Sequence, residues 1–455
     1  KGEASRSLIK LYLRTGLAEC AFDALERAKS QVLLSYVANR EQFHWSQGDE
    51  HNQVLMEELN HLRAEHQWFY GLAHEPPRNT ERLNVIQPEQ ALAEVAVRER
   101  RMRSITEQLY LHSGDDHQAQ YVETTSLNDI QPRLQDGTLL IEFYYDGSYL
   151  QAFLIDQRSI CVHSLPITGE ALNQLLAQLR VNISGALTVD PRTDAARRLV
   201  GLAHRILKRL YSLLIEPLAL HEYNPQKLVI VPYGMLHYFP FNILYDGSAY
   251  LIEKHEIVIL PAAGLATRPL VKRDPGALIL ANSWEGRLPH TLTEAQMVQR
   301  LVGGTLCTGE SANRSALQAS PRQILHIAAH GEHRLDQPDL SYLQLADGQL
   351  FADDTLQQDM SYELVTLSAC ETGRANVAAS DELIGLGRGF LYAGAGALLV
   401  SMWQVPDIST LYFMERFYKA LCSGDSKATS LQRAQQYMLA EEPWQHPAFW
   451  GAFQL

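Results

Sequence analysis

Short apolar runs alternate with helix-spaced segments from residue 138 to the end of the chain. Thr138–Tyr145 and Tyr149–Ile155 flank an Asp146-Gly147 pair, which predicts a β-hairpin. Further apolar runs predict buried strands, and apolar residues three and four positions apart predict helices. The strands expected next are 159–165, 227–231 and 256–260, and the helices are 169–179 and 195–215. This alternation predicts a first α/β unit of roughly 140 residues.

A second α/β unit is expected to begin at Ala277, after a joining segment at 263–276 that is rich in charged residues and proline. Two of its apolar runs, Gln323–Gly331 and Leu364–Gly373, end in residues that can start a turn. A hairpin is expected around Asp347-Gly348. The other expected elements are strands at 277–281 and 396–402 and helices at 293–302, 311–318, 383–392, 408–421 and 427–440.

The N-terminal part of the chain has a helical pattern. Residues 1–70 carry apolar residues at helical spacing and resemble one tetratricopeptide repeat, which cannot bury its own apolar face alone. We therefore interpret 1–70 as the end of a repeat array, with a plain helical hairpin as the alternative. Residues 71–124 are expected to form a connector and a long charged helix. In that helix, the run from Arg98 to Arg103 predicts a solvated face.

Composition and charge narrow the possible functions. The chain has 455 residues, of which 46% are hydrophobic, and a formal net charge of -13. This acidity argues against direct nucleic-acid binding, which needs clustered basic residues. No apolar run reaches the roughly 18 residues of a membrane span, and no signal peptide opens the chain. Because the first residue is Lys1, we expect a fragment or a processed form.

The cysteines indicate the redox environment. There are five of them, widely spaced and without a C-x-x-C pair: Cys20, Cys161, Cys307, Cys370 and Cys422. This spacing indicates neither a zinc site nor a disulfide framework. We therefore expect the reducing environment of a cytoplasm.

Two of the apolar runs end in residues that can carry out chemistry. His330 ends one run and Cys370 ends the other, and each is followed by a turn that contains glycine. Open α/β sheets bind ligands at the carboxyl ends of their strands. If both strands belong to one sheet, the imidazole and the thiol predict a cysteine nucleophile with its base. The alternative is that each is a core residue, because a single cysteine in an apolar strand is usually buried.

The motifs H-x-A-A-H-G (His326–Gly331) and L-S-A-C-E-T-G (Leu367–Gly373) resemble the signature of the CHAT peptidases. These are caspase-like cysteine peptidases that accompany tetratricopeptide repeats and are related to separase. The resemblance implies a caspase-like three-layer α/β/α catalytic domain, an inactive caspase-like half before it and an N-terminal α-helical segment. The implied division is 1–70 (helical), 71–124 (connector and charged helix), 125–265 (inactive half) and 266–455 (catalytic half).

The resemblance also implies roles for individual residues. Cys370 is the nucleophile, and His330 is its base and later the acid that protonates the leaving amine. The backbone amides of Gly331 and Cys370 hold the oxyanion, because amides in tight turns can approach the developing charge.

The segment Trp403–Asp407 bears on substrate preference. Its pattern W-x-V-x-D resembles a separase segment whose aspartate lies in the pocket for the residue before the scissile bond. By this match Asp407 receives an Arg or Lys side chain, since a buried carboxylate needs a cationic partner. Capping of a helix that starts at Ile408 is the alternative role, and the two are compatible. Asp381 and Glu382 are further candidates for the pocket. Ser368 faces the same side of the strand as Cys370 and is expected to line the pocket without adding charge.

Metal and cofactor chemistry is not expected. His326 and His330 have the spacing of a metal-binding pair on a helix, but their run predicts a strand and lacks the glutamate of H-E-x-x-H. His326 is therefore expected to be a core residue or a residue that supports the site without touching substrate. A P-loop motif and a G-x-S-x-G elbow are both absent from the sequence.

Together these features predict a cytoplasmic cysteine endopeptidase that cleaves a protein substrate after a basic residue, through a thioester intermediate. A regulatory protein partner is expected to act through the helical N-terminal region. The alternative is a catalytically silent scaffold that binds partners through its helical and caspase-like parts. Neither nucleic acid nor a membrane is expected as a direct partner.

Overall fold

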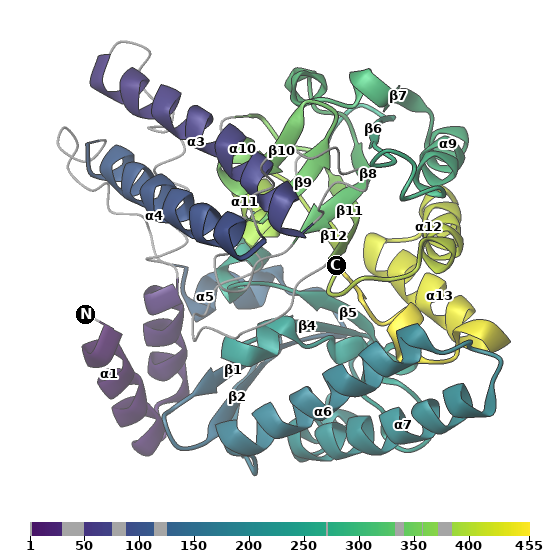
Figure 1. Ribbon diagram of the computed structural model, residues 1–455. Coiled ribbons are helices and arrows are strands. Elements are labelled where there is room, and N and C mark those ends of the chain that lie inside the picture. Colours follow the sequence, from purple (N-terminus) through teal and green to yellow (C-terminus); the bar gives the residue numbers. More distant parts are fainter. Residues whose placement is uncertain are drawn as a thin grey trace. The chain divides into compact units, whose positions relative to one another are not determined.

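The computed structural model describes residues 2–29, 50–74, 88–112, 125–269, 272–332, 341–356, 358–371 and 385–455. The chain divides into two compact units: Lys1–Leu33 with Glu123–Leu455, and Leu34–Val122. The larger unit holds two β-sheets with helices packed against them (Figure 1). Because strands and helices alternate through most of this unit, the predicted α/β fold class is confirmed.

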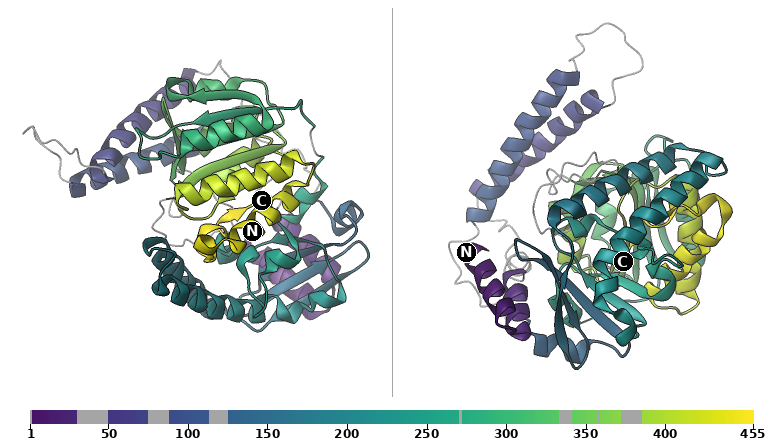
Figure 2. Two further views of the ribbon diagram at one scale, coloured as in Figure 1. Left: turned by 90° about the vertical axis from the view of Figure 1, so that its right-hand side faces the viewer. Right: turned by 90° about the horizontal axis from the view of Figure 1, so that it is seen from below.

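The first sheet has, within the described residues, five strands in the order β3-β2-β1-β4-β5. β2 is antiparallel to β1 and β3, whereas β4 and β5 run parallel to β1. Helices α6 and α7 lie side by side against one face (Figure 2). Seven of the eight residues of β1 are buried, because helices cover both faces of the sheet. The bounds are β1 Thr138–Tyr145, β2 Leu150–Ile155, β3 Ile160–Leu165, β4 Lys227–Val231, β5 Glu256–Ile259, α6 Gly169–Thr188 and α7 Asp194–Leu214.

The second sheet has eight strands in the described ranges. β7, β6, β8, β11 and β12 pair in this order and run parallel, β13 is antiparallel to β12, and the hairpin β9–β10 joins the end of β8. α9, α12 and α13 cover one face, and α10 and α11 the other, which gives three layers (Figures 1 and 2). The strands are β6 Ala277–Ala281, β7 Gly304–Thr308, β8 Ile324–Glu332, β9 Tyr342–Leu345, β10 Gly348–Phe351, β11 Leu364–Glu371, β12 Leu398–Ser401 and β13 Phe453–Gln454. The helices are α9 Thr291–Val302, α10 Ala352–Leu356, α11 Gly385–Tyr392, α12 Asp407–Cys422 and α13 Lys427–Ala440.

Two elements of the second half differ from the prediction. The apolar pattern does not predict β7, because this strand begins with glycine and its residues are at most partly buried. Gly304 has a φ of 107°, and a Cβ at this position would overlap the backbone of Ala277 on β6. The helix predicted at 311–318 is wrong: the chain forms short 3₁₀ turns, of which Arg314–Gln318 is capped by the Asn313 side chain. An asparagine that bonds to nearby backbone favours such turns over a helix.

The C-terminal tail ties the two sheets together. β13 pairs with β12 of the second sheet, while the Ile259 N–H of β5 donates to the carbonyl oxygen of Leu455 at 2.8 Å. Asn242, which belongs to the first half, donates through Nδ2 to the carbonyl oxygens of Gly451 and Phe453. One apolar core therefore extends from α6 and α7 to α12 and α13.

The first two helices pack against the other face of the first sheet. α1 (Gly2–Arg14) and the helix at 18–29 share an apolar core with β1, β2 and β4. In this core, the rings of Phe22 and Phe153 have centroids 5.9 Å apart. These helices belong to the larger unit, so the predicted segment 1–70 is divided between the two units. The other predicted domain limits stay predictions.

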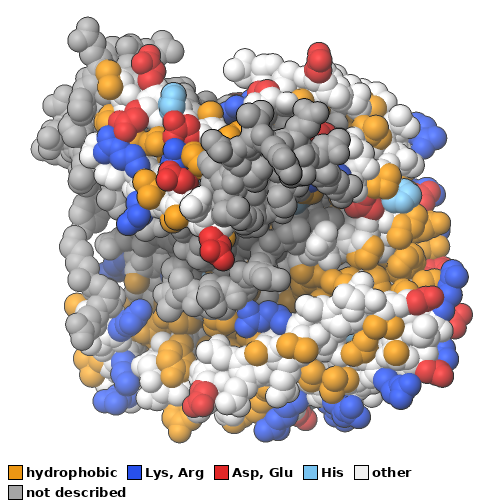
Figure 3. Space-filling view, in the orientation of Figure 1, with side chains coloured by type: hydrophobic (Ala, Val, Ile, Leu, Met, Phe, Trp, Pro, Cys, Tyr) orange, Lys and Arg blue, Asp and Glu red, His pale blue; other side chains and the backbone are white. Residues whose placement is uncertain are grey.

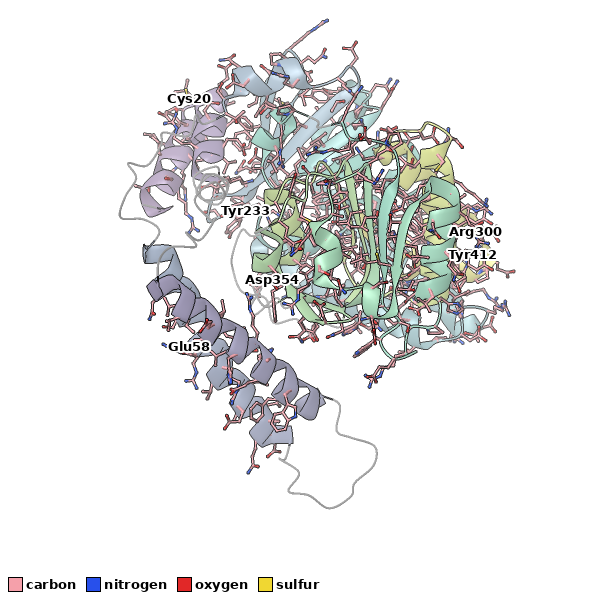
Figure 4. The ribbon with its side chains drawn as sticks, turned by 90° about the horizontal axis from the view of Figure 1, so that it is seen from above. Cys20, Glu58, Tyr233, Arg300, Asp354 and Tyr412 are labelled. Atoms are coloured by element: carbon pink, nitrogen blue, oxygen red, sulfur yellow. The ribbon has the colours of Figure 1, made fainter. Side chains whose placement is uncertain are left out.

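The smaller unit contains a hairpin of two helices that pack against each other. Glu99 is only 4% exposed, and its Oε1 lies 3.0 Å from Nε2 of His66. Arg101 donates to both carboxylate oxygens of Glu58, which Figure 4 labels on α3. The predicted solvated face is therefore wrong for Glu99, whose carboxylate is buried against the neighbouring helix. The bounds are α3 Glu50–His74 and α4 Pro88–His112.

His446 fixes the tail against α6 as a neutral ring. It is 3% exposed, its Nδ1 accepts from the Ala448 N–H at 3.0 Å, and its Nε2 lies 3.0 Å from Oδ1 of Asn182. A neutral imidazole with its proton on Nε2 satisfies both contacts. Burial, assisted by nearby His204, lowers the pKa of His446 from 6.5 to about 4.

We expect the free energy of unfolding to fall as the pH decreases from 6.5 towards 4, since only the unfolded chain binds a proton at His446 in this range. At about pH 5 the loss from this group is roughly 2 kcal/mol, at about 1.4 kcal/mol per pKa unit. Urea unfolding at about pH 7.5 and about pH 5 measures the difference. His446→Gln should reduce it, whereas His221→Gln, at an exposed position, should not. Equal pH dependence of wild type and His446→Gln contradicts this account.

Candidate active site

His330 and Cys370 lie on adjacent parallel strands. β8 and β11 pair from Leu364 opposite Ile324 to Glu371 opposite Gly331, and this register pairs Cys370 directly with His330. The expectation that both strands belong to one sheet is confirmed. Cys370 is placed by its backbone on β11, and its side chain lies outside the described residues. The side chain of His330 belongs to the described part of the chain.

The His330 ring is stacked on the indole of Trp284. The ring centroids are 3.8 Å apart, the planes differ by 9°, and His330 is 6% exposed. Tyr342 of β9 approaches the imidazole edge-on, with centroids 6.4 Å apart, and its hydroxyl donates to Glu332 at 3.1 Å. Trp284 is a residue that the sequence pattern does not single out. It follows β6 and reaches His330 because β6 pairs with β8.

Trp284 is held in a turn with unusual backbone angles. φ is 48° at Trp284 and 56° at Glu285, in the left-handed region that costs non-glycine residues about 1–3 kcal/mol each. The Asn282 side chain accepts from the Trp284 N–H at 3.0 Å and donates to the Gln344 carbonyl oxygen at 3.0 Å. The Arg287 guanidinium lies 4.6 Å from the centroid of the indole. Such strain persists where surrounding contacts fix the backbone, and it concentrates at functional sites.

A buried polar network lies on the same strand as His330. His326 is 0% exposed, its Nε2 lies 3.1 Å from Oε1 of Glu294 on α9, and its Nδ1 lies 3.0 Å from the Tyr418 hydroxyl on α12. Tyr418 donates in turn to Oγ1 of Thr366 on β11 at 2.8 Å. The network therefore connects both strands of the candidate site to α9 and α12, which run side by side over this face (Figure 2). His326 is a core residue, as the sequence predicts.

Asp407 is the first residue of α12 and is half-buried. Pro406 occupies the N-cap position, so Asp407 lies inside the first turn, where the helix dipole favours an acidic side chain, and not at the cap. Burial raises the pKa of Asp407 and Glu294 adds to this shift, whereas His290 opposes it. The two carboxyl groups are thus close enough to repel each other when both are ionised. A cation beside them would relieve that repulsion.

The remaining predicted site residues are placed to different extents. Gly331 is buried in β8 opposite Glu371. Ser368 lies opposite Ala328, and its buried hydroxyl has no hydrogen-bond partner among the described residues. Asp381 and Glu382 lie outside the described residues. The structure therefore brings His330, Ser368 and the backbone of Cys370 together on neighbouring strands. Asp407 interacts with Glu294, which in turn lies beside His326 of β8.

The first half offers a different arrangement. His237, which follows β4, is 4% exposed, and burial lowers its pKa to about 3. Its ring nitrogens have no hydrogen-bond partner within the described ranges. On β3, Cys161 Sγ lies 3.4 Å from Nε2 of His163 and 2.9 Å from the Tyr223 hydroxyl. This cysteine and histidine belong to one edge strand, unlike the pair on β8 and β11.

Other kinds of site receive little support in the described part of the chain. It contains no group of three or more His, Cys, Asp or Glu side chains arranged for a metal ion. None of its helices is long and apolar enough to cross a membrane. A surface cavity of about 630 Å³ lies on the first half, lined by Lys208, Tyr211, Asp246 and neighbouring residues, none of them from β8 or β11.

The chain matches one family model and is similar to a protein known from two organisms. Residues 204–455 match the family model of the CHAT domain. Tetratricopeptide repeat protein 28 of Mus musculus is 28% identical to this chain, and that of Homo sapiens is 25% identical, each over 59% of the chain. The match covers 14% of either relative, so the chain spans a small part of their length.

Two kinds of solved structure are similar to the chain at 10% sequence identity. Separase of Saccharomyces cerevisiae, in its complex with securin, has a TM-score of 0.49 and covers 97% of this chain and 40% of its own. The Arg-specific cysteine proteinase gingipain R has a TM-score of 0.34 and covers 61% of this chain and 74% of its own.

Tyr418→Phe tests the buried network. The variant keeps the ring but leaves His326 Nδ1 and Thr366 without the hydroxyl that joins them. We expect a loss of about 1–3 kcal/mol in the free energy of unfolding, because buried polar groups without partners are costly. Urea denaturation measures the loss. Tyr412→Phe is the matched control on the same helix, since Tyr412 is 42% exposed and lies at the outer surface (Figure 4). A cost for Tyr418→Phe no larger than that of the control contradicts this role.

Proposed function

The chain belongs to the CHAT domain family, and from this premise we propose that it is a cysteine endopeptidase whose catalytic dyad is His330 and Cys370. The observation that carries the proposal is the register of β8 and β11, which pairs these residues directly. Laterally paired residues of neighbouring parallel strands project from the same face of a sheet. An imidazole beside a thiol at a strand end is the arrangement that activates a cysteine.

The proposed reaction has two stages. His330 takes the proton of the Cys370 thiol, and the thiolate attacks the scissile carbonyl to form a tetrahedral oxyanion, with the amides of Gly331 and Cys370 as donors. His330 then returns the proton to the leaving amine, which leaves a thioester on Cys370. Water hydrolyses the thioester, and His330 accepts the proton of that water. The C–S bond then breaks, the product acid departs, and His330 returns its proton to the Cys370 thiolate.

We further propose that the residue before the cut is basic and that Asp407 recognises it. Burial and the neighbouring Glu294 both disfavour an ionised Asp407, so an incoming Arg or Lys side chain supplies the missing positive charge. Ser368 is proposed to line the same pocket, because it faces the same side of β11 as Cys370 and its buried hydroxyl has no partner among the described residues. Asp381 and Glu382 stay further candidates for this pocket.

The proposed partners are a protein substrate and a regulatory protein that engages the helical part of the chain. The relatives of this chain given above are named tetratricopeptide repeat proteins, and helical repeats form extended surfaces that bind other proteins. The same observation favours the alternative function of a catalytically silent scaffold. A scaffold would also use apolar surface such as that over α12, where Ile408 and Tyr412 are 37% and 42% exposed (Figure 3). A cytoplasmic location is proposed with either function.

Cys370→Ala tests the nucleophile. We expect hydrolysis of a library of fluorogenic peptides to fall by at least ~10³-fold, the scale seen when a nucleophile is removed. Cys161→Ala is the matched control, because Cys161 also contacts a histidine but lies on the first sheet. Equal turnover by wild type and Cys370→Ala rules out the nucleophile.

If the chain hydrolyses none of the peptides, alkylation of its cysteines distinguishes the peptidase from the scaffold. Iodoacetamide should alkylate Cys370 faster than the exposed thiols Cys20 and Cys422, and His330→Ala should slow that reaction by about 10-fold. Site-specific mass spectrometry measures both rates. A Cys370 that reacts no faster than the exposed thiols favours the scaffold.

Asp407→Asn tests the basic preference. We expect kcat/KM for peptides with Arg or Lys before the cut to fall about tenfold or more, the scale of one charge-assisted contact. For peptides with a neutral residue before the cut, kcat/KM should change little. Glu415→Gln, farther along α12, is the control for a charge change on the same helix. An unchanged rate on Arg substrates removes Asp407 from the pocket.

A further inference from the structure

We propose that Trp284 is a positioning residue, which fixes the plane of the His330 ring so that an imidazole nitrogen is held along the sheet edge, towards Cys370. This inference rests on the proposed function, because it takes His330 as the base. Trp284 itself touches neither the thiol nor the substrate in this account. It acts through the stacking contact alone.

The stacking geometry suits this role. The histidine side chain has a broad, weakly preferred torsion at χ2, so its ring plane needs an outside constraint. Trp284 supplies one, because a ring parallel to within 9° and 3.8 Å away prevents the imidazole from turning. The lone pair and the N–H of an imidazole lie in the ring plane, whereas the indole covers only a face. The contact therefore restrains the ring through one face and does not cover the edge that carries the nitrogens.

The stack also favours the charged form that the mechanism needs. When the thiol proton moves to His330, a thiolate and an imidazolium result, and no other bond changes. The face of an indole attracts cations, so Trp284 stabilises the imidazolium from a direction that does not compete with Cys370. Among the described contacts, Tyr342 meets the His330 ring edge-on, and its hydroxyl donates to Glu332 on the same strand as His330. Arg287 lies against the indole as well and helps to hold it.

The turn that carries Trp284 is anchored to the strand of His330. The Asn282 N–H donates to the carbonyl oxygen of Ala328, two residues before His330, at 2.9 Å. The Asn282 side chain fixes the Trp284 N–H and the Gln344 carbonyl, as described above. Trp284 and Glu285 nevertheless keep left-handed backbone angles that side chains disfavour. A turn built only to connect β6 to α9 would have no need of this strain.

The test measures Cys370 directly, without a peptide substrate. Iodoacetamide alkylation of Cys370 in the full chain is followed by mass spectrometry from about pH 5 to about pH 9, for wild type, Trp284→Leu and Trp284→Phe. We expect Trp284→Leu to slow alkylation at about pH 7 by about 10-fold and to move the pH midpoint upwards, as the base is misplaced and the thiolate less favoured. Trp284→Phe, which keeps an aromatic face, should stay within about threefold of wild type. Trp68→Ala, in the smaller unit, is the control.

Each outcome decides between this role and plain packing. Equal rates and midpoints in wild type and Trp284→Leu show that Trp284 only fills space and overturn the proposal, as does a faster reaction, which would mean that the indole blocks His330. A wild-type Cys370 that reacts no faster than the exposed cysteines refutes the proposed function itself.

A second measurement needs no variant of Trp284. Protonated imidazole quenches an indole in contact with it, so tryptophan emission of the wild type should fall as His330 takes up a proton, and His330→Gln should lose that step. Identical titrations of the two proteins contradict the stack.

Discussion

The parallel pairing of β8 with β11 is the constraint on which the candidate site depends. Backbone hydrogen bonds set the register, and a slip of one residue would place His330 beside a neighbour of Cys370 and reverse the faces of one strand. Contacts on both faces oppose such a slip. On one face Tyr418 joins His326 to Thr366. On the other face, apolar side chains of both strands pack in one core with α11.

The polar residues behind the site lie on three elements, β8, α9 and α12, and interact with one another. His326 on β8 meets Glu294 on α9, and Glu294 influences Asp407 at the start of α12. Buried carboxylates are costly unless a cation or several donors compensate them. Glu294 lies 3.1 Å from the His326 ring, and the described surroundings of Asp407 include the amide and the ring of His290. Asp407, whose pKa is raised by burial, therefore gains from a cation beside it.

The sequence predicted the strands well because their signal is local. Buried strands of a parallel sheet are covered on both faces, so β4, β6, β8 and β11 are continuous apolar runs, and the Asp-Gly turns announce both hairpins. Elements with weak local signals were not predicted correctly. β7 is an edge strand that begins with glycine, and the segment that Asn313 caps forms 3₁₀ turns where a helix was predicted. The pairing of His330 with Cys370 was a hypothesis about which strands are neighbours, and no local sequence pattern contains that information.

Contacts between distant residues were the least predictable. Trp284 meets His330 only because β6 pairs with β8 and because two residues adopt left-handed angles, which no sequence pattern marks. Glu99 belongs to an arginine-rich run that predicts a solvated helix face, but its carboxylate lies against His66 of the neighbouring helix. In both cases the partner, not the local composition, decides where the side chain lies.

The two sheets use their carboxyl edges in different ways. In the second sheet the edge after β8 and β11 carries His330 and Cys370. In the first, the end of β4 lies beside Glu142 of β1, whose carboxylate is 2.7 Å from the ammonium of Lys29 in the chain's own N-terminal helix. Burial raises the pKa of Glu142 to about 8, and the nearby Glu26 accepts from the Gly264 N–H. In the first sheet this part of β1 therefore contacts buried polar side chains of the helix at 18–29, whereas the second sheet carries the candidate site.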